Sequence, residues 1–281
     1  MSEHEHEFSV KLMSETLGIS RSGYYAWLKR PLSNRAQVNK VLSAKVKEEF
    51  KKNHGYYGSP RLHAHLRRQG YQCGRHLVAR MMQELNLRAK KKAKKYPQTT
   101  FQRKGDRFAP NILNQDFTAS RPNEKWVGDF TYIDTLEGWL YLAAIEDLYS
   151  RKIVGWSMAE HMDTALVMGA WNMAMINRNP DPGLLHHTDR GSQYTSDEYQ
   201  AQLFSGNYTA SMSRSGNCYD NAVIESFFST LKTECADHQF TTKKDARTTL
   251  FEYIEIWYNR ERLHSTLGYC SPVEFELMSG H

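Results

Sequence analysis

The stretch KWVGDFTYIDTLEGWLYLAAIEDLYSRKIVGWSMAE, residues 125–160, contains three runs that are rich in aromatic and β-branched residues. The runs cover residues 125–134, 138–147 and 151–160, and they are separated by turn-forming residues at Gly138 and at 148–150. Runs of this length and composition, with turn signals between them, are typical of β-strands. We therefore expect three consecutive strands in this part of the chain.

The elements that follow alternate between helix and strand, as judged from apolar periodicity, capping residues and turn signals. The predicted helices are 163–178, 196–206, 221–234 and 243–262, and the predicted strands are 184–188 and 208–213. The resulting order, βββαβαβα, is that of an RNase H-like α/β domain with a mixed five-stranded central sheet. We also assign Trp126, Trp139 and Trp156 to the core of this sheet.

The N-terminal part predicts helices alone. Residues 8–30 and 59–89 each contain two amphipathic segments separated by a break, at Gly18 and at Gly70, and Ser20 and Ser59 are suitable N-caps. A helix-turn-helix inserts its second helix into a DNA groove, but short helical hairpins with solvated arginines have the same pattern. If the pattern is a DNA-binding one, the candidate contacts are Arg67, Arg68, Arg75 and Arg80.

Charge is distributed unevenly between the two halves of the chain. Residues 1–119 carry 24 Lys and Arg against 9 Asp and Glu, whereas the remainder carries 13 against 22. A surplus of cations suits binding to a polyanion such as DNA, although a soluble lysine-rich surface gives the same count. The lysine-rich segment 88–107, which includes the candidate DNA contacts Lys91 and Lys92, has the composition of an inter-domain linker.

These patterns predict four regions. They are a helical region at 1–95 with a candidate helix-turn-helix for DNA binding, a basic linker at 96–119, an RNase H-like core at 120–235 and a C-terminal helical extension at 236–281.

Composition also excludes several classes of protein. No stretch approaches the roughly 18 to 20 apolar residues of a membrane helix, and the first residues lack the features of a signal peptide, so we expect a cytoplasmic protein. Four distant cysteines without a CxxC pair predict reduced thiols. His63, His65, Cys73 and His76 match no strong zinc signature and fit phosphate or core contacts equally well.

Three carboxylates are notable for their positions in the predicted fold. Asp129 lies in the first strand, Asp189 follows the fourth, and Glu225 lies in a later helix, with 35 residues between the last two. Carboxylates gathered from separate elements repel each other unless cations join them, and oxygen ligands favour Mg²⁺ or Mn²⁺. Two such ions would support phosphodiester cleavage. Taken singly, each residue could equally be a strand-end, turn or surface carboxylate.

Residues near these carboxylates extend the candidate site. Lys232 is seven residues beyond Glu225, which places both on one helix face and lets the lysine reach a phosphate. The preceding segment carries the candidate DNA contacts Arg214, Asn217 and Asn221. The roles of His186 and His187 are left open, and Arg262 could either contact DNA or brace the catalytic helix.

The segments WVGDFTYI, HTDRGSQYTS, SRSGNCYDNAVIESFFSTLKTE and YNRERLHSTLGYCSPVEF resemble the catalytic core of bacterial insertion-sequence transposases of family three, the OrfB type. These belong to the DDE transposase and retroviral-integrase superfamily. ISRSGYYAWLKR and the segment around residues 57–89 resemble the helix-turn-helix region before that core. The resemblance covers roughly residues 17–276.

This resemblance implies specific roles. Asp129, Asp189 and Glu225 match the three metal-binding carboxylates of the family, and Lys232 matches its basic residue on the same helix. The implied activity is Mg²⁺-dependent cleavage at the ends of an element, followed by attack of the freed 3′-OH on another phosphodiester, with two ions per site and Mn²⁺ as a substitute.

The implied partners are double-stranded DNA, as terminal inverted repeats and as target, and at least one further copy of the chain on DNA. Family members usually act as a fusion with an upstream OrfA portion that carries a leucine-zipper segment. No sustained heptad run, the pattern of such a segment, is present in this sequence. Two alternatives remain: an OrfB-only regulator that binds DNA without catalysis, and an RNase H-like nuclease that cleaves without joining ends.

Overall fold

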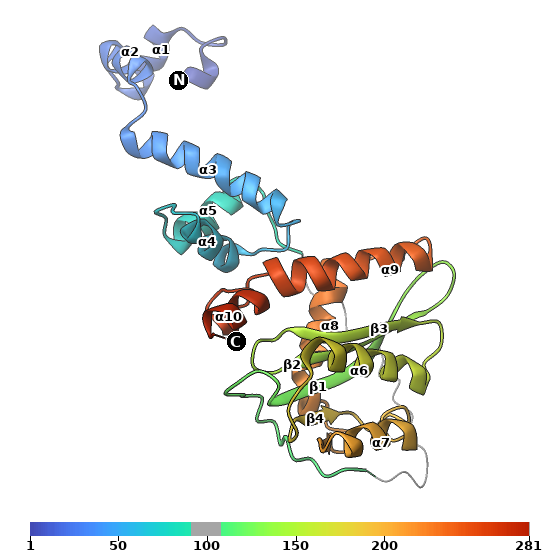
Figure 1. The fold of residues 1–281 in the computed structure, drawn as a ribbon. Helices are drawn as coiled ribbons and strands as arrows, with labels where there is room; N and C mark the ends of the chain where they lie inside the picture. Colours follow the sequence, from blue (N-terminus) through green and yellow to red (C-terminus); the bar gives the residue numbers. More distant parts are fainter. Residues whose placement is uncertain (91–107, 281) are drawn as a thin grey trace.

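A computed structural model describes residues 1–90 and 108–280 of the chain, and its fold is shown in Figure 1. The strands are β1 (Lys125–Ile133), β2 (Leu140–Asp147), β3 (Ile153–Ala159), β4 (Leu185–Thr188) and β5 (Thr209–Met212). The α-helices are α1 (Val10–Leu17), α2 (Arg21–Lys29), α3 (Asn34–Lys52), α4 (Ser59–Arg68), α5 (Arg75–Glu84), α6 (Thr164–Arg178), α7 (Asp197–Ser205), α8 (Ala222–Glu234), α9 (Lys243–Glu252) and α10 (Pro272–Met278). Shorter helical segments are η1 (Ser2–His4), η2 (Cys218–Asn221), η3 (Tyr253–Glu261) and η4 (Ser265–Leu267).

The five strands form one sheet in the order β3-β2-β1-β4-β5. The first three strands are antiparallel neighbours, whereas β4 runs parallel to β1 and β5 runs parallel to β4. The predicted mixed five-stranded sheet of an RNase H-like core is therefore confirmed. Strand β1 is central because it pairs with both β2 and β4, so a side chain on β1 is near elements from both halves of the sheet.

Helices cover both faces of the sheet, with α6 on one face and α8 on the other (Figure 1). Alternate residues of β1 supply the two cores, because successive strand residues point to opposite faces. Trp126 packs against Trp171 of α6 with ring centroids 6.0 Å apart, whereas Val127 joins the core that contains Phe227 of α8. An added Cβ on Gly155 of β3 would lie 2.2 Å from a carbonyl oxygen of α6, so this glycine permits close helix packing.

Two sequence predictions about local structure are wrong, and one helix was not predicted. Trp139 is 48% exposed at the start of the β2 hairpin and is not a core residue. Gly58, not Ser59, is the N-cap residue of α4. Helix α3 was not predicted, although Ser33 caps it and Leu42 and Val46 are buried one turn apart, a signal that its many polar residues obscured.

The N-terminal helices form two groups at opposite ends of α3 (Figure 1). Helices α4 and α5 pack with the C-terminal half of α3, where Leu62, Leu66 and Val78 are fully buried. Tyr57 joins this group to the C-terminal extension, because its hydroxyl accepts from Leu263 N at 2.9 Å. Within the described residues, none of the helices is long and apolar enough to cross a membrane.

The predicted helix 243–262 changes its winding midway. It is α-helical as α9 and continues as the π-helical segment η3. Tyr253 and Trp257 of η3 donate to Glu234 Oε2 at 2.9 and 3.2 Å, and Arg262 donates to both oxygens of the same carboxylate at 2.8–3.0 Å. Both Glu234 and Arg262 are buried. Of the two roles that the sequence left open for Arg262, the structure therefore supports bracing the C-terminal end of α8 and not contacting DNA.

Candidate active site

The three predicted carboxylates come from adjacent elements. Asp129 lies in the middle of β1, Asp189 directly follows β4, and Glu225 lies in the first turn of α8. Because β1 and β4 are parallel neighbours, the residue that follows β4 lies beside the middle of β1. Helix α8 packs on β1 through the core that contains Ile224, which brings its first turn to the same place.

The charges of the three carboxylates interact. Burial and the neighbouring carboxylate of Asp189 raise the pKa of Asp129 well above its ordinary value, and Glu225 adds to the increase. A hydrogen bond from Phe130 N works in the opposite direction but does not offset these effects. Like charges held this close are costly in the absence of a cation, which is the electrostatic pattern of a metal site.

Backbone contacts orient both aspartates. Asp129 Oδ1 accepts from Phe130 N at 2.8 Å, and Asp189 Oδ1 accepts from Gly191 N at 2.9 Å. An added Cβ on Gly191 would lie 3.0 Å from that same oxygen, which explains the glycine in the sequence Asp-Arg-Gly. Arg190 donates to Ser213 O at 2.7 Å and so holds the turn against the end of β5.

Tyr194 is a residue of this site that the sequence analysis did not identify. It is 2% exposed and packs near Phe130, with ring centroids 6.3 Å apart. Burial raises its pKa well above the ordinary value, and the charges of Asp129 and Asp189 raise it further. The phenol therefore stays protonated beside the carboxylates. Its place in a Ser-rich turn gave no sign that it was near them.

Lys232 lies two turns along α8 from Glu225, as predicted. Its Nζ is 4.4 Å from the centroid of the Tyr132 ring, and that ring packs edge-to-face on Trp139 at 4.8 Å. Burial lowers the pKa of Lys232 to about 8. A phosphate next to this ammonium would stabilise its charged form, since an opposite charge favours ionisation.

The loop before α8 is held in place by a buried aspartate. Arg214 donates to Asp220 from Nε at 2.9 Å and from Nη2 at 2.7 Å, and these bonds lower the pKa of Asp220. Asn217 caps η2 by accepting from Tyr219 N. Asn221 is 4% exposed and donates to Gly128 O at 3.3 Å, so its burial argues for positioning α8 against β1 rather than for a DNA contact.

The two histidines before Asp189 have structural partners. His186 Nε2 lies 2.7 Å from the Tyr199 hydroxyl, and the two ring nitrogens of His187 lie 2.8 and 3.1 Å from the hydroxyls of Ser211 and Ser213. Burial lowers the pKa of His186 to about 3 and that of His187 to about 4, so both are neutral at physiological pH. They join β4 to α7 and β5.

The predicted DNA contacts of α4 and α5 are all exposed. Arg68 forms a two-pronged ion pair with Glu274 of α10, Arg67 donates to Gln72, and Arg80 lies 3.5 Å from Glu84. Arg75 is at the start of α5. The predicted contacts Lys91 and Lys92 lie outside the described residues.

Two groups of potential metal ligands can be compared. Of the zinc candidates, His63 bonds to Cys73 O and His65 to Glu49, so they do not converge. Within residues 1–90 and 108–280, no three His, Cys, Asp or Glu side chains form a finished ion-binding cluster. The carboxylates of Asp129, Asp189 and Glu225 nevertheless lie near enough for their charges to interact. Their all-oxygen chemistry and mutual repulsion fit a hard divalent cation.

Models of known families match about three quarters of the chain. Two models of an integrase core domain match residues 119–218 and 207–272, and a model of a helix-turn-helix-like domain matches residues 37–95. The fold and these matches define the protein as a polynucleotidyl transferase of the integrase-core class.

Individual relatives show to which family within this class the chain belongs. Transposase InsF for insertion sequence IS3A of Escherichia coli K12 is 44% identical over 276 residues, 97% of this chain and 96% of the relative. The chain belongs to the IS3 family of transposases and is a DNA transposase. A 31 kDa protein of insertion element IS600 from Shigella sonnei is 44% identical over 94% of this chain and 97% of its own. The HTLV-2 integrase catalytic core in complex with magnesium aligns at 15% identity over 57% of this chain and 99% of its own, with a TM-score of 0.42.

Proposed function

We propose that Asp129, Asp189 and Glu225 hold two Mg²⁺ ions, which Mn²⁺ can replace, and that the site cleaves one strand at each end of an insertion sequence and joins it to target DNA. The observation that carries this proposal is geometric: the parallel pairing of β1 with β4 and the first turn of α8 bring the three carboxylates together. Their charges accordingly act on one another, as the raised pKa of Asp129 indicates. When bound, the ions would supply the positive charge that activates the attacking oxygen and stabilises the leaving one.

The surrounding residues have distinct parts in this proposal. Lys232 binds a phosphate of the DNA, which explains a partly buried ammonium on the same helix as Glu225. Tyr194 and Arg190 position the turn that carries Asp189. Asn221 sets the distance between α8 and β1 through its bond to Gly128 O. No high-energy cofactor is required, because cleavage is a hydrolysis that leaves a 3′-OH, and joining exchanges one phosphodiester bond for another when that 3′-OH attacks the target.

The wider assembly is also part of the proposal. We infer that two or more copies act on paired DNA ends in the bacterial cytoplasm, with Arg67, Arg75, Arg80 and Arg214 among the contacts to duplex DNA. We retain the division into the regions 1–95, 96–119, 120–235 and 236–281. Residues 111–115 nevertheless bond to Ser211 and Asp220, so the end of the linker lies along the core. An OrfA portion would add a second means of pairing one copy of the protein with another.

The test of this function is a strand assay on purified full-length chain. The probe is a duplex that carries the terminal repeat flanking the gene, incubated with Mn²⁺ and a target plasmid. We expect a nick at the repeat end and then joined product. Binding without any nick would support the regulatory alternative, and cleavage without joining would support a nuclease.

Ion binding should depend on pH in a defined direction. The folded-state pKa of Asp129 is raised, so the folded protein keeps a proton that the unfolded chain has already lost, and ion-free stability falls as pH rises through this range. Since the ions bind the ionised carboxylate, Mg²⁺ affinity should rise with pH and binding should release protons. Calorimetric titration in two buffers of different ionisation enthalpy measures this release. Equal heats in both buffers would contradict it.

A further inference from the structure

The turn between β1 and β2 carries two large apolar side chains on the surface. Leu136 is 68% exposed, and Trp139 is 48% exposed. The Trp139 ring packs edge-to-face on Tyr132 of β1, with ring centroids 4.8 Å apart. Single exposed apolar side chains are common on protein surfaces, so their surroundings decide whether they have a role.

Hydrogen bonds hold this turn against the segment that precedes α9. Leu136 N donates to Phe240 O at 2.9 Å, and Phe240 N donates to Asp134 O at 3.0 Å. At the start of α9, Lys243 N donates to Glu137 Oε2 at 2.8 Å. The exposed indole is therefore presented by a turn that is fixed in place, which suits contact with a defined position in a ligand.

The aromatic pair of Tyr132 and Trp139 lies beside the candidate active site. Lys232 of α8 places its Nζ 4.4 Å from the centroid of the Tyr132 ring. Tyr132 is three strand residues beyond Asp129, a span of about 10 Å. Lys232 is seven helix residues beyond Glu225, a span of about 10.5 Å. Because α8 packs on β1 and the two spans match, the aromatic pair lies about 10 Å from the carboxylates.

A cation next to an aromatic ring is an arrangement with which proteins bind unpaired nucleotides, since the cation contacts the phosphate and the ring stacks on the base. We propose that Trp139 stacks on an unpaired base near the cleaved phosphate, while Lys232 binds the phosphate beside that base. This inference rests on the proposed catalytic site and adds the contact that holds the end of the DNA open. Every base has a π-face, so the contact tolerates different sequences.

The distance from the carboxylates indicates which base is involved. Successive bases of one strand are about 3.4 Å apart along a duplex, so about 10 Å corresponds to about three positions. The stacked base is therefore expected within about three positions of the cleaved phosphate. Taking a base out of a duplex costs free energy, which stacking on Trp139 offsets. A base that is already mismatched costs less, and this difference provides the test.

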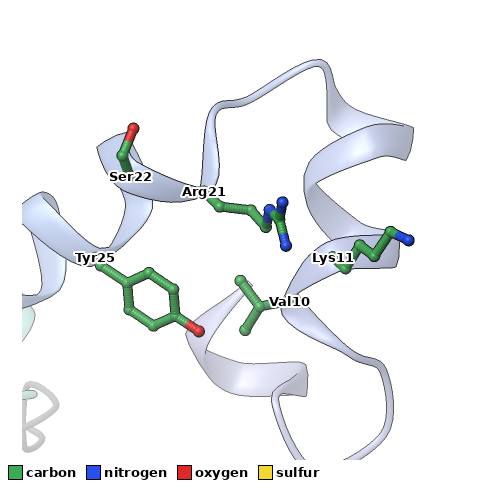
Figure 2. Close-up of a pocket in the computed structure, with 5 residues that line it drawn as sticks. All are labelled: Val10, Lys11, Arg21, Ser22 and Tyr25. Atoms are coloured by element: carbon green, nitrogen blue, oxygen red, sulfur yellow. The ribbon is translucent and has the colours of Figure 1, made fainter.

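Another exposed aromatic residue provides a matched control. Tyr25 of α2 is 46% exposed, and with Val10, Lys11, Arg21 and Ser22 it lines a hollow beside α1 and α2 (Figure 2). It therefore also combines an aromatic ring with nearby cations. The two helices lie at the end of α3 that is far from the catalytic core, so this ring is remote from the three carboxylates (Figure 1).

The test measures the affinity of the full-length protein for two forms of the duplex that carries the terminal repeat. One form is fully paired, and the other has one mismatched pair, placed in turn at each position near the cleaved phosphate. The measurements use the Glu225→Gln background without divalent cations, so the DNA stays uncleaved. Failure of the catalytic proposal is therefore distinguishable, because this measurement does not depend on cleavage.

The Glu225→Gln protein should bind a mismatched duplex more tightly than the paired one. Adding Trp139→Ala should lower the affinity for the mismatched duplex by about 5- to 150-fold, the contribution of one stacked base, and should abolish the preference. Trp139→Phe keeps a ring and should retain most of the preference. Leu136→Ala and Tyr25→Ala should retain all of it.

Cleavage gives a second readout that damage to the fold would not reproduce. With Glu225 intact and Mn²⁺ present, Trp139→Ala should nick the paired duplex more slowly than wild type, and the mismatch should restore part of the rate. An unchanged mismatch preference in Trp139→Ala would overturn the proposal. So would an equal loss in Leu136→Ala, which would assign the effect to the shape of the turn. A changed oligomeric state of Trp139→Ala with unchanged preference would also overturn it and make the turn a contact between copies.

Discussion

Replacing Asp189 with Asn should reduce strand cleavage and joining by more than about 100-fold. Mutation of residues that merely support a metal ligand already costs 10- to 100-fold, so loss of a ligand should cost more. The amide can still accept from Gly191 N, so the local turn should persist. DNA binding should remain within a few fold of wild type, as measured by the retardation of the terminal-repeat duplex.

Thermal unfolding with and without Mg²⁺ gives a second readout for this variant. Removing the charge of Asp189 relieves one cause of the raised pKa of Asp129, so the ion-free Asp189→Asn protein should be at least as stable as wild type. Wild type should gain stability with Mg²⁺, because a ligand that binds the folded state stabilises it, and the variant should not. The control Glu198→Gln changes an exposed carboxylate of α7 and should cleave normally. Wild-type cleavage by Asp189→Asn would refute the proposed ligand set.

Glu234→Ala should lower the free energy of unfolding by about 3 to 5 kcal/mol, the cost of leaving a buried charge without its partner. The carboxylate accepts from Arg262, Tyr253 and Trp257, and it lies where α8 meets η3. Its removal leaves the Arg262 guanidinium buried and unpaired. Urea denaturation followed by far-ultraviolet circular dichroism measures this loss.

Two variants make the measurement specific. Glu252→Ala removes an exposed carboxylate near the end of α9 and should change stability by less than about 0.5 kcal/mol. The milder Glu234→Gln keeps an oxygen for Tyr253 and Trp257 and should lie between Glu234→Ala and wild type, which preserves the test if the alanine variant does not fold. A midpoint for Glu234→Ala equal to that of wild type would show that the ion pair adds nothing.

Much of the core was predictable because its signals are local. The aromatic and β-branched runs of β1, β2 and β3 and the cap of α2 depend on neighbouring residues alone, and the structure confirms them. Helix α3 was missed because much of its surface is polar and few of its residues are buried. Trp139 was assigned wrongly because strand composition does not show which end of a hairpin leaves the sheet.

The spacing of Asp129, Asp189, Glu225 and Lys232 was legible in the sequence because each lies at a fixed place in a recognisable element. Their electrostatic coupling was not, since it depends on the parallel pairing of β1 with β4 and on the packing of α8. The place of Tyr194 beside the carboxylates, the neutral state of His186 and the ion pair of Arg262 could not be read from the sequence either, because each depends on tertiary packing.

The sequence by itself therefore determined the order of the elements, the family resemblance and the identity of the candidate carboxylates. The tertiary structure decided which charges lie close together, which polar groups are buried and which cations remain on the surface. It also joined the helices around Tyr57 to the C-terminal extension, more than 200 positions away. Periodicity and caps act over a few residues, whereas burial and Coulomb interactions depend on distance in space.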